Sequence, residues 1–117
     1  MAKGKEPSRA EVLHGTLDLM VLQTLDGLGP LHGYGIARRI EQVSEDALKL
    51  NEGTVHAALT RLEQRRLISA TWGLSENNRK ARFYNLTALG RRQLHREAEQ
   101  WSRMAGIMAR LLRPSER

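Results

Sequence analysis

The chain has 117 residues, and its 19 lysines and arginines exceed its 13 aspartates and glutamates, for a formal net charge of +6. A small domain this basic favours a polyanionic partner such as nucleic acid. The lack of cysteine excludes disulfides and thiolate metal sites and suits a cytoplasmic protein, and no apolar run approaches the roughly 20 residues that cross a membrane. We therefore expect one domain with a packed core, no cofactor, no metal and no membrane partner.

The chain is predicted to begin with a flexible segment and a buried helix. Residues 1–10 are polar and basic, and we expect them to form a disordered arm. Apolar residues at helical spacing predict a largely buried helix over 11–28. Gly29 and Pro30 follow, and this pair ends the helix.

Two further helices are predicted before the chain changes its pattern. The first covers about 33–43, and the connection after it allows a short strand at 48–50, where two leucines alternate around a lysine. Asn51 is a suitable N-cap for the next helix, over about 51–66. Apolar side chains at intervals of three and four residues predict the buried face of this helix: Val55, Ala58, Leu59 and Leu62.

The hydrophobic period then changes from 3.6 to 2, which is typical of strands. Residues 68–72 alternate between apolar and hydroxyl side chains, 73–78 are rich in turn formers, and 81–86 predict the returning strand. Thr87 is positioned to cap a long last helix that ends before Pro114. The sequence thus predicts a mainly α fold with a small β-hairpin, namely a winged helix-turn-helix over 11–86 and a C-terminal dimerisation helix over 87–113.

The helix over 51–66 and the hairpin are the predicted contacts with double-stranded DNA. In a helix-turn-helix the second helix enters the major groove, where polar side chains hydrogen-bond to base edges or phosphates. The candidates on this helix are Thr54, His56, Thr60, Arg61 and Arg65. The candidates on the hairpin, which would meet phosphates or the minor groove, are Arg79, Lys80 and Arg82. A polar helix face or a basic hairpin taken alone is also compatible with a surface that only meets solvent.

The last helix carries an apolar seam with heptad-like spacing, which predicts pairing with a second copy of the chain. The seam residues are Leu94, Ala98, Trp101, Ala105, Met108 and Leu112. A two-fold dimer matches the symmetry of a palindromic operator. Trp101 is either a large residue of the dimer core or one wall of a site for a flat apolar ligand, which Met104 and Met108 would complete.

No arrangement of residues predicts catalysis, so we do not expect an enzyme. The main prediction is a DNA-binding repressor. Two alternatives remain open from the residues: a winged helix that serves as a protein-interaction module without DNA binding, and a ligand carrier that uses the dimer core. The basic cluster on the hairpin favours DNA, because an interaction module has no need of three cations within four positions.

Three motifs in order resemble the PadR family of transcriptional regulators. The stretch 29–36 (GPLHGYGI) is similar to the family's G-x-x-x-G-Y-x-I, and 52–59 (EGTVHAAL) to its E-G-[ST]-[LI]-Y-P-A-L. The stretch 79–87 (RKARFYNLT) resembles R-[KR]-x-[KR]-Y-Y-x-[LI]-T. The resemblance extends over about 13–112.

The resemblance implies a winged-helix homodimer that represses nearby genes and is released by a ligand or another signal. It places Tyr34 near DNA, together with Thr54, His56, Lys80 and Arg82. Trp101 lies in a Trp-Ser-Arg context that lines a pore at the dimer centre in ligand-binding members, which implies a small hydrophobic effector. His56 and Ala57 replace the family's Tyr-Pro. If the imidazole of His56 replaces the missing phenol as a donor to DNA, binding should be mildly pH-sensitive.

Overall fold

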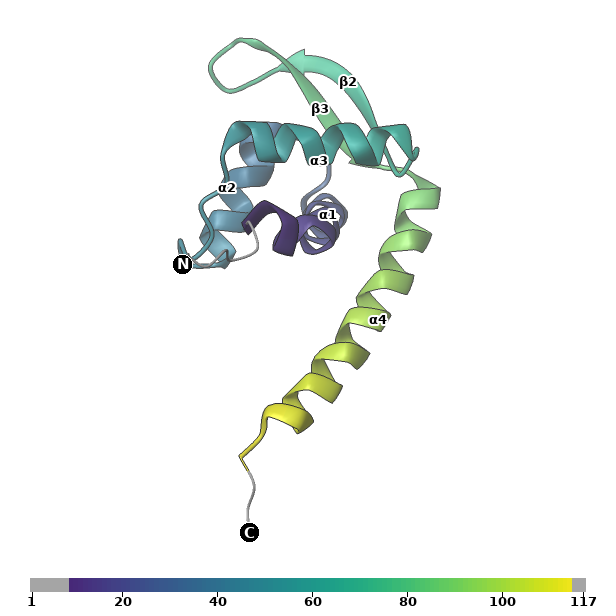
Figure 1. Cartoon of the computed structure of the whole chain (residues 1–117). Helices are drawn as coiled ribbons and strands as arrows, with labels where there is room; N and C mark the ends of the chain where they lie inside the picture. The colour runs from purple at the N-terminus through teal and green to yellow at the C-terminus, as the bar shows by residue number, and fades with distance from the viewer. Residues whose placement is uncertain (1–8, 115–117) are drawn as a thin grey trace.

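The computed structural model describes residues 9–114, which form four helices and three short strands (Figure 1). The elements are α1 (Arg9–Leu28), β1 (Leu31–His32), α2 (Gly33–Val43), α3 (Glu52–Gln64), β2 (Ile68–Leu74), β3 (Lys80–Leu86) and α4 (Ala88–Leu112). The predicted mainly α fold with a β-hairpin is therefore confirmed. Helix α1 begins at Arg9, so the last two residues of the predicted arm belong to it, and residues 1–8 lie outside the described part.

The three strands form one antiparallel sheet in the order β1-β3-β2. Strands β2 and β3 pair along their full length, from Ile68 opposite Leu86 to Leu74 opposite Lys80. Strand β1 pairs with the other edge of β3, where Leu31 lies opposite Tyr84. The sequence did not predict β1, because two residues are too few to show an alternating pattern.

The short strand that the sequence allows at 48–50 does not form. The backbone N–H of Leu48 donates to the hydroxyl of Ser44 at 3.1 Å, and that of Leu50 donates to the carboxylate of Glu41 at 3.2 Å. Side chains of α2 and of the residue that caps it therefore take the donors that a strand would give to a neighbour. These bonds shape the connection between α2 and α3.

The core lies where α1, α2 and α3 meet the base of the sheet. The predicted inner face of α3 is confirmed, since each of its four apolar side chains is at most 3% exposed. Leu22 and Leu25 of α1 and Ile36 of α2 are equally buried. In Figure 1, α1 crosses on one side of α3 and the β2–β3 hairpin lies on the other. Helix α3 is thus held between two supports, and its remaining surface faces outward.

A close packing of backbone fixes where α4 begins. Thr87 caps α4 by accepting from the N–H of Gly90 at 2.9 Å, and its hydroxyl also lies 2.8 Å from the carbonyl of Arg66. Gly90 packs directly against the backbone carbonyl of Leu67, so close that an added Cβ would overlap the oxygen. The start of α4 is therefore locked onto the junction between α3 and β2.

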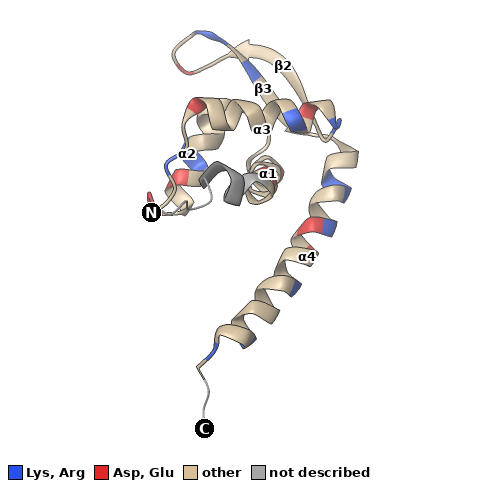
Figure 2. Cartoon of the chain, in the orientation of Figure 1, with Lys and Arg blue, Asp and Glu red and all other residues tan. Residues whose placement is uncertain are grey.

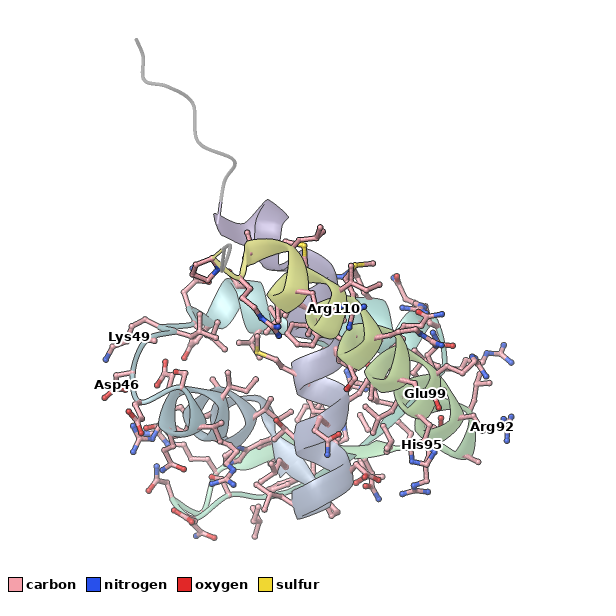
Figure 3. All side chains as sticks on the ribbon, turned by 90° about the horizontal axis from the view of Figure 1, so that it is seen from below. Asp46, Lys49, Arg92, His95, Glu99 and Arg110 are labelled. Atoms are coloured by element: carbon pink, nitrogen blue, oxygen red, sulfur yellow. The ribbon has the colours of Figure 1, made fainter. Side chains whose placement is uncertain are left out.

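Beyond its first turns, α4 extends away from the rest of the protein (Figure 1). Arg91 pairs with Asp26 of α1 at 3.2 Å, and Leu94 is buried in the core. From Trp101 onward, the large apolar side chains of α4 are substantially exposed. Seen from below, Arg92 projects from α4 on the side away from α1 (Figure 3). The second half of the helix thus lacks a partner for its apolar side chains within the described part of the chain.

Candidate nucleic-acid interface

The N-terminus of α3 is well ordered by its cap and open on its outer surface. The side chain of Asn51 accepts from the N–H of Thr54 at 2.8 Å, as the sequence predicted. Helical periodicity aligns Gly53, Ala57 and Thr60 along the line farthest from the core, and all three are exposed. Small side chains on this line allow the helix backbone to approach a flat or grooved partner closely.

The two flanks of α3 are tied to its neighbours by ion pairs. Arg61 donates to the carboxylate of Asp18 on α1, with its Nη2 at 2.7 Å and its Nε at 3.4 Å. On the opposite flank, Glu63 accepts from Arg82 of β3 at 2.7 Å. The ion pairs set the orientation of α3 relative to α1 and to the hairpin.

Helix α2 contributes an exposed aromatic ring beside α3. His32 caps α2 through its Nδ1, which accepts from the N–H of Gly35 at 2.9 Å. The His32 ring also packs against Phe83, with 5.2 Å between ring centroids. Tyr34 follows in the first turn and is 69% exposed. The cap and the Phe83 contact therefore anchor the end of α2 that presents Tyr34.

The hairpin ends in a tight turn that carries the basic cluster. Two backbone hydrogen bonds of 2.8 Å close this turn: the N–H of Ser75 donates to the carbonyl of Arg79, and the N–H of Asn78 donates to the carbonyl of Ser75. Asn78 adopts a φ of 63°, which asparagine tolerates better than most residues. Arg79 and Lys80 are exposed at its end. The guanidinium of Arg82 lies 5.7 Å from the centre of the Tyr84 ring, in addition to its bond with Glu63.

An open cleft of about 1090 Å³ separates the hairpin from α2 and the N-terminal half of α3. The predicted DNA-contacting residues that line this cleft are Tyr34, His56, Arg79, Lys80 and Arg82. The other predicted residues are not among its lining: Thr54, Thr60, Arg61 and Arg65. Thr60 lies on the outward line of α3, whereas Arg61 faces α1 and is occupied by Asp18. The structure therefore gives Arg61 a structural partner that the sequence did not suggest.

Among the cleft residues that were not predicted as site residues, Arg38 and Trp72 have side chains suited to a nucleic-acid contact. Arg38 lines the cleft from α2, and Trp72 lines it from β2 with 67% of its surface exposed. The sequence places Arg38 on the polar face of its helix, but it gives no distance to the hairpin. The alternation along 68–72 predicts Trp72 on the inner face of the hairpin, but not that α3 leaves it uncovered.

The cleft carries both signs of charge, with the cations concentrated on the hairpin. Figure 2 shows basic segments at the tip of the hairpin and along β3. The lining of the cleft includes four cations, namely Arg38 and the three of the hairpin. It also includes three carboxylates, Glu41, Glu52 and Glu76. Glu41 is engaged by the N–H of Leu50, and Glu52 lies in the first turn of α3, where the helix dipole favours a negative charge.

The predicted seam of α4 divides into a buried and an exposed part. Leu94 is 1% exposed and belongs to the core of its own chain, so it cannot contribute much surface to a second copy. Trp101, Met108 and Leu112 are 53%, 45% and 73% exposed, and Ala98 and Ala105 are partly exposed between them. Met104 is also exposed.

Three helices, a basic-tipped hairpin beside the outward face of α3, and a projecting last helix define a winged helix-turn-helix protein. A family model described as the transcriptional regulator PadR-like family matches residues 21–96. The chain belongs to this family, so the resemblance seen in its motifs is confirmed. It is a transcriptional regulator and not an enzyme.

Solved structures of similar regulators share the whole fold. A transcriptional regulator from Clostridium thermocellum aligns with a TM-score of 0.78 at 23% identity, covering 92% of this chain and 100% of that one. A PadR-like regulator from Bacillus cereus gives a TM-score of 0.76 at 22% identity, covering 89% and 98%. A PadR family regulator from Clostridium difficile is 30% identical with a TM-score of 0.71, covering 84% and 99%.

Two sequence relatives cover different shares of their own length. A protein X of Lysinibacillus sphaericus is 26% identical over 86% of this chain and 91% of its own. A 37.1 kDa protein in transposon TN4556 of Streptomyces fradiae is 41% identical over 75% of this chain, but the chain spans only 24% of that protein.

None of the helices within residues 9–114 has the length and apolar character needed to cross a membrane.

Proposed function

We propose that the chain is a homodimeric repressor that binds a palindromic operator in double-stranded DNA. The observation that carries this proposal is the position of the basic hairpin beside the open face of α3, across a cleft that both elements line. An exposed helix flanked by a cationic hairpin fits duplex DNA, in which a groove lies next to a phosphate backbone.

In the proposed complex, α3 enters the major groove along its line of small side chains. Thr60 lies on that line, and His56 lies beside it toward the hairpin, so both are candidates to meet base edges. Arg79 and Lys80 meet phosphates of the adjacent backbone, and Tyr34 approaches the backbone from the α2 side. Arg61 is assigned a structural role, because its guanidinium is held by Asp18.

The proposed dimer forms through the exposed part of the α4 seam. Trp101, Ala105, Met108 and Leu112 recur at intervals of four, three and four residues, so they form one stripe on the helix. An exposed apolar stripe of this kind is costly in water and is typical of an interface. Pairing two copies by a two-fold axis presents two α3 helices to two half-sites related by the same symmetry.

A small hydrophobic effector is the proposed signal for release. Trp101 offers a flat apolar ring, and Met104 and Met108 offer flexible side chains that adapt to varied ligands. A planar apolar compound that binds there is expected to quench tryptophan emission and to lower operator affinity in parallel. Compounds that quench the emission but leave the affinity unchanged would contradict this part of the proposal.

Footprinting of the DNA upstream of the chain's own gene tests the main proposal. We expect a protected segment made of two inverted half-sites, with centres about one helical turn, roughly 34–36 Å, apart or a multiple of that distance. A reporter gene driven by this DNA should be repressed when the chain is expressed. A single unpaired footprint would contradict the dimer, and activation of the reporter would contradict repression.

A further inference from the structure

Trp72 has an unusual position on the inner face of the hairpin. The inner face of β2 starts in the core at Ile68, which is 2% exposed, continues through Ala70, and reaches Trp72 beyond the cover of α3. Trp72 lies directly opposite Arg82 in the β2–β3 register, and both line the cleft. Residues opposite each other in an antiparallel pair share a face, so the indole and the guanidinium lie on the same wall.

The exposure of Trp72 contrasts with the aromatic residue on the other face of the hairpin. Phe83 packs against the His32 ring, and its own ring lies close over Gly73. The hairpin thus has two aromatic side chains outside the core. Phe83 is packed against its neighbours, whereas the larger Trp72 is open to the cleft. A tryptophan that keeps 67% of its surface exposed is more typical of a contact surface than of a structural position.

We propose that Trp72 contacts duplex DNA by packing its indole against the deoxyribose rings of the strand that enters the cleft. This inference rests on the proposed function, because it requires α3 in the major groove. The DNA backbone that separates the major groove from the adjacent minor groove then lies between α3 and the hairpin. Here the indole meets apolar sugar carbons, and its N–H can donate to a phosphate oxygen.

The charges around Trp72 favour DNA over a protein partner. Arg82 lies opposite Trp72, and Lys80 lies two residues farther toward the tip on the same face. The cross-strand pairs Trp72–Arg82 and Leu74–Lys80 thus place apolar groups beside cations on this face, which matches a DNA backbone in which sugars alternate with phosphates. The same contact carries no base recognition, so it should raise affinity for all DNA sequences by a similar factor.

Tryptophan emission gives a direct test, since the chain contains only Trp72 and Trp101. A duplex from the DNA upstream of the chain's own gene is added to the unaltered protein and to the Trp72→Phe variant, and binding is followed in parallel by gel shift. We expect the duplex to change the emission of the unaltered protein. The Trp72→Phe variant should still bind the duplex but lose most of the emission change.

Affinity measurements supply the second test and its control. Trp72→Ala should weaken binding roughly tenfold to the upstream duplex and to a shuffled duplex alike, as expected for one exposed indole losing its apolar contact. Thr71→Ala is the matched control, because Thr71 is exposed on the opposite face of the same strand and is not among the cleft residues. This variant should bind within about twofold of the unaltered protein.

The inference requires both results. It is overturned if the emission change persists in Trp72→Phe, or if Trp72→Ala binds both duplexes as tightly as the unaltered protein. Either outcome would leave the surface around Trp72 to a protein partner. Failure of the unaltered protein to bind any duplex would instead contradict the proposed function itself, so the two failures are distinct. Because Trp72 is exposed, thermal unfolding of Trp72→Ala should match that of the unaltered protein.

Discussion

Arg61 on α3 and Asp18 on α1 form an ion pair in which the guanidinium reaches both carboxylate oxygens, at 2.7 and 3.4 Å. The Asp18 side chain is 12% exposed and that of Arg61 is 30% exposed, so water screens the pair only partly. The pair joins the first helix to the flank of α3 that faces away from the hairpin. It therefore fixes the orientation at which α3 meets its target.

Breaking this pair should lower stability without changing sequence preference. We expect Asp18→Asn and Arg61→Gln each to reduce the free energy of unfolding by about 1–2 kcal/mol, because each leaves a partly buried partner without its counter-charge. Urea denaturation of the two single variants and the double variant measures the coupling between the residues. Additive effects would show that the pair contributes nothing, and an altered operator preference in Arg61→Gln would show that Arg61 meets bases.

Gly90→Ala should be strongly destabilising. The added methyl group would overlap the carbonyl oxygen of Leu67, which belongs to the backbone and cannot rotate away. We expect a loss of about 2–4 kcal/mol in the free energy of unfolding, because α4 must shift from its seat.

Gly27→Ala is the control for this substitution. Gly27 lies in α1, and an added Cβ there meets nothing within 4 Å. Alanine is a better helix former than glycine, so this variant should be unchanged or more stable by up to about 1 kcal/mol. Equal stability of the Gly27→Ala and Gly90→Ala variants in thermal or urea unfolding would contradict the packing described for α4.

Lys80→Ala should reduce the salt dependence of DNA binding. If Lys80 neutralises one phosphate, the slope of log affinity against log salt should become shallower by about 1. Arg92→Ala removes the same charge from α4, where the side chain projects into solvent (Figure 3), and it should leave the slope unchanged. Equal effects of the two substitutions would indicate a response to net charge alone rather than a contact at the hairpin.

Met108→Asp should dissociate the proposed dimer. The substitution places a charge within the apolar stripe of α4, and a buried unpaired carboxylate is costly. Sedimentation velocity should then give a monomer, and operator affinity should fall because the two half-sites are no longer bound together. Gln100→Asp adds the same charge to an exposed position of α4 outside the stripe and should remain dimeric. A monomeric unaltered protein would contradict the dimer directly.

Much of this fold was predictable because its signals are local. The caps at Asn51 and Thr87 need only a side chain and the next helical turn, and both form as predicted. The spacing of Val55 and Leu59 identified the inner face of α3 for the same reason. The change of period after α3 likewise gave the hairpin.

The features that escaped prediction depend on partners distant in the sequence. Arg61 is expected on an outer face of its helix, and only the packing of α1 brings Asp18 to it. Strand β1 forms because β3 returns beside it. The absence of a strand at 48–50 is a local exception, because the hydroxyl of Ser44, only four residues earlier, accepts the N–H of Leu48. Leu94 matches the spacing of the seam, yet the start of α4 is buried in its own core.

Operator binding by α3 and the hairpin is tested most directly by an anisotropy titration of the unaltered protein at several salt concentrations. Two labelled duplexes are compared, the footprinted operator and a shuffled sequence of equal length. We predict two chains per operator duplex, tighter binding to the operator than to the shuffled duplex, and an affinity for both that falls steeply as salt rises. Equal affinity for the two duplexes, or binding that does not respond to salt, would contradict the claim that α3 and the basic hairpin together bind an operator.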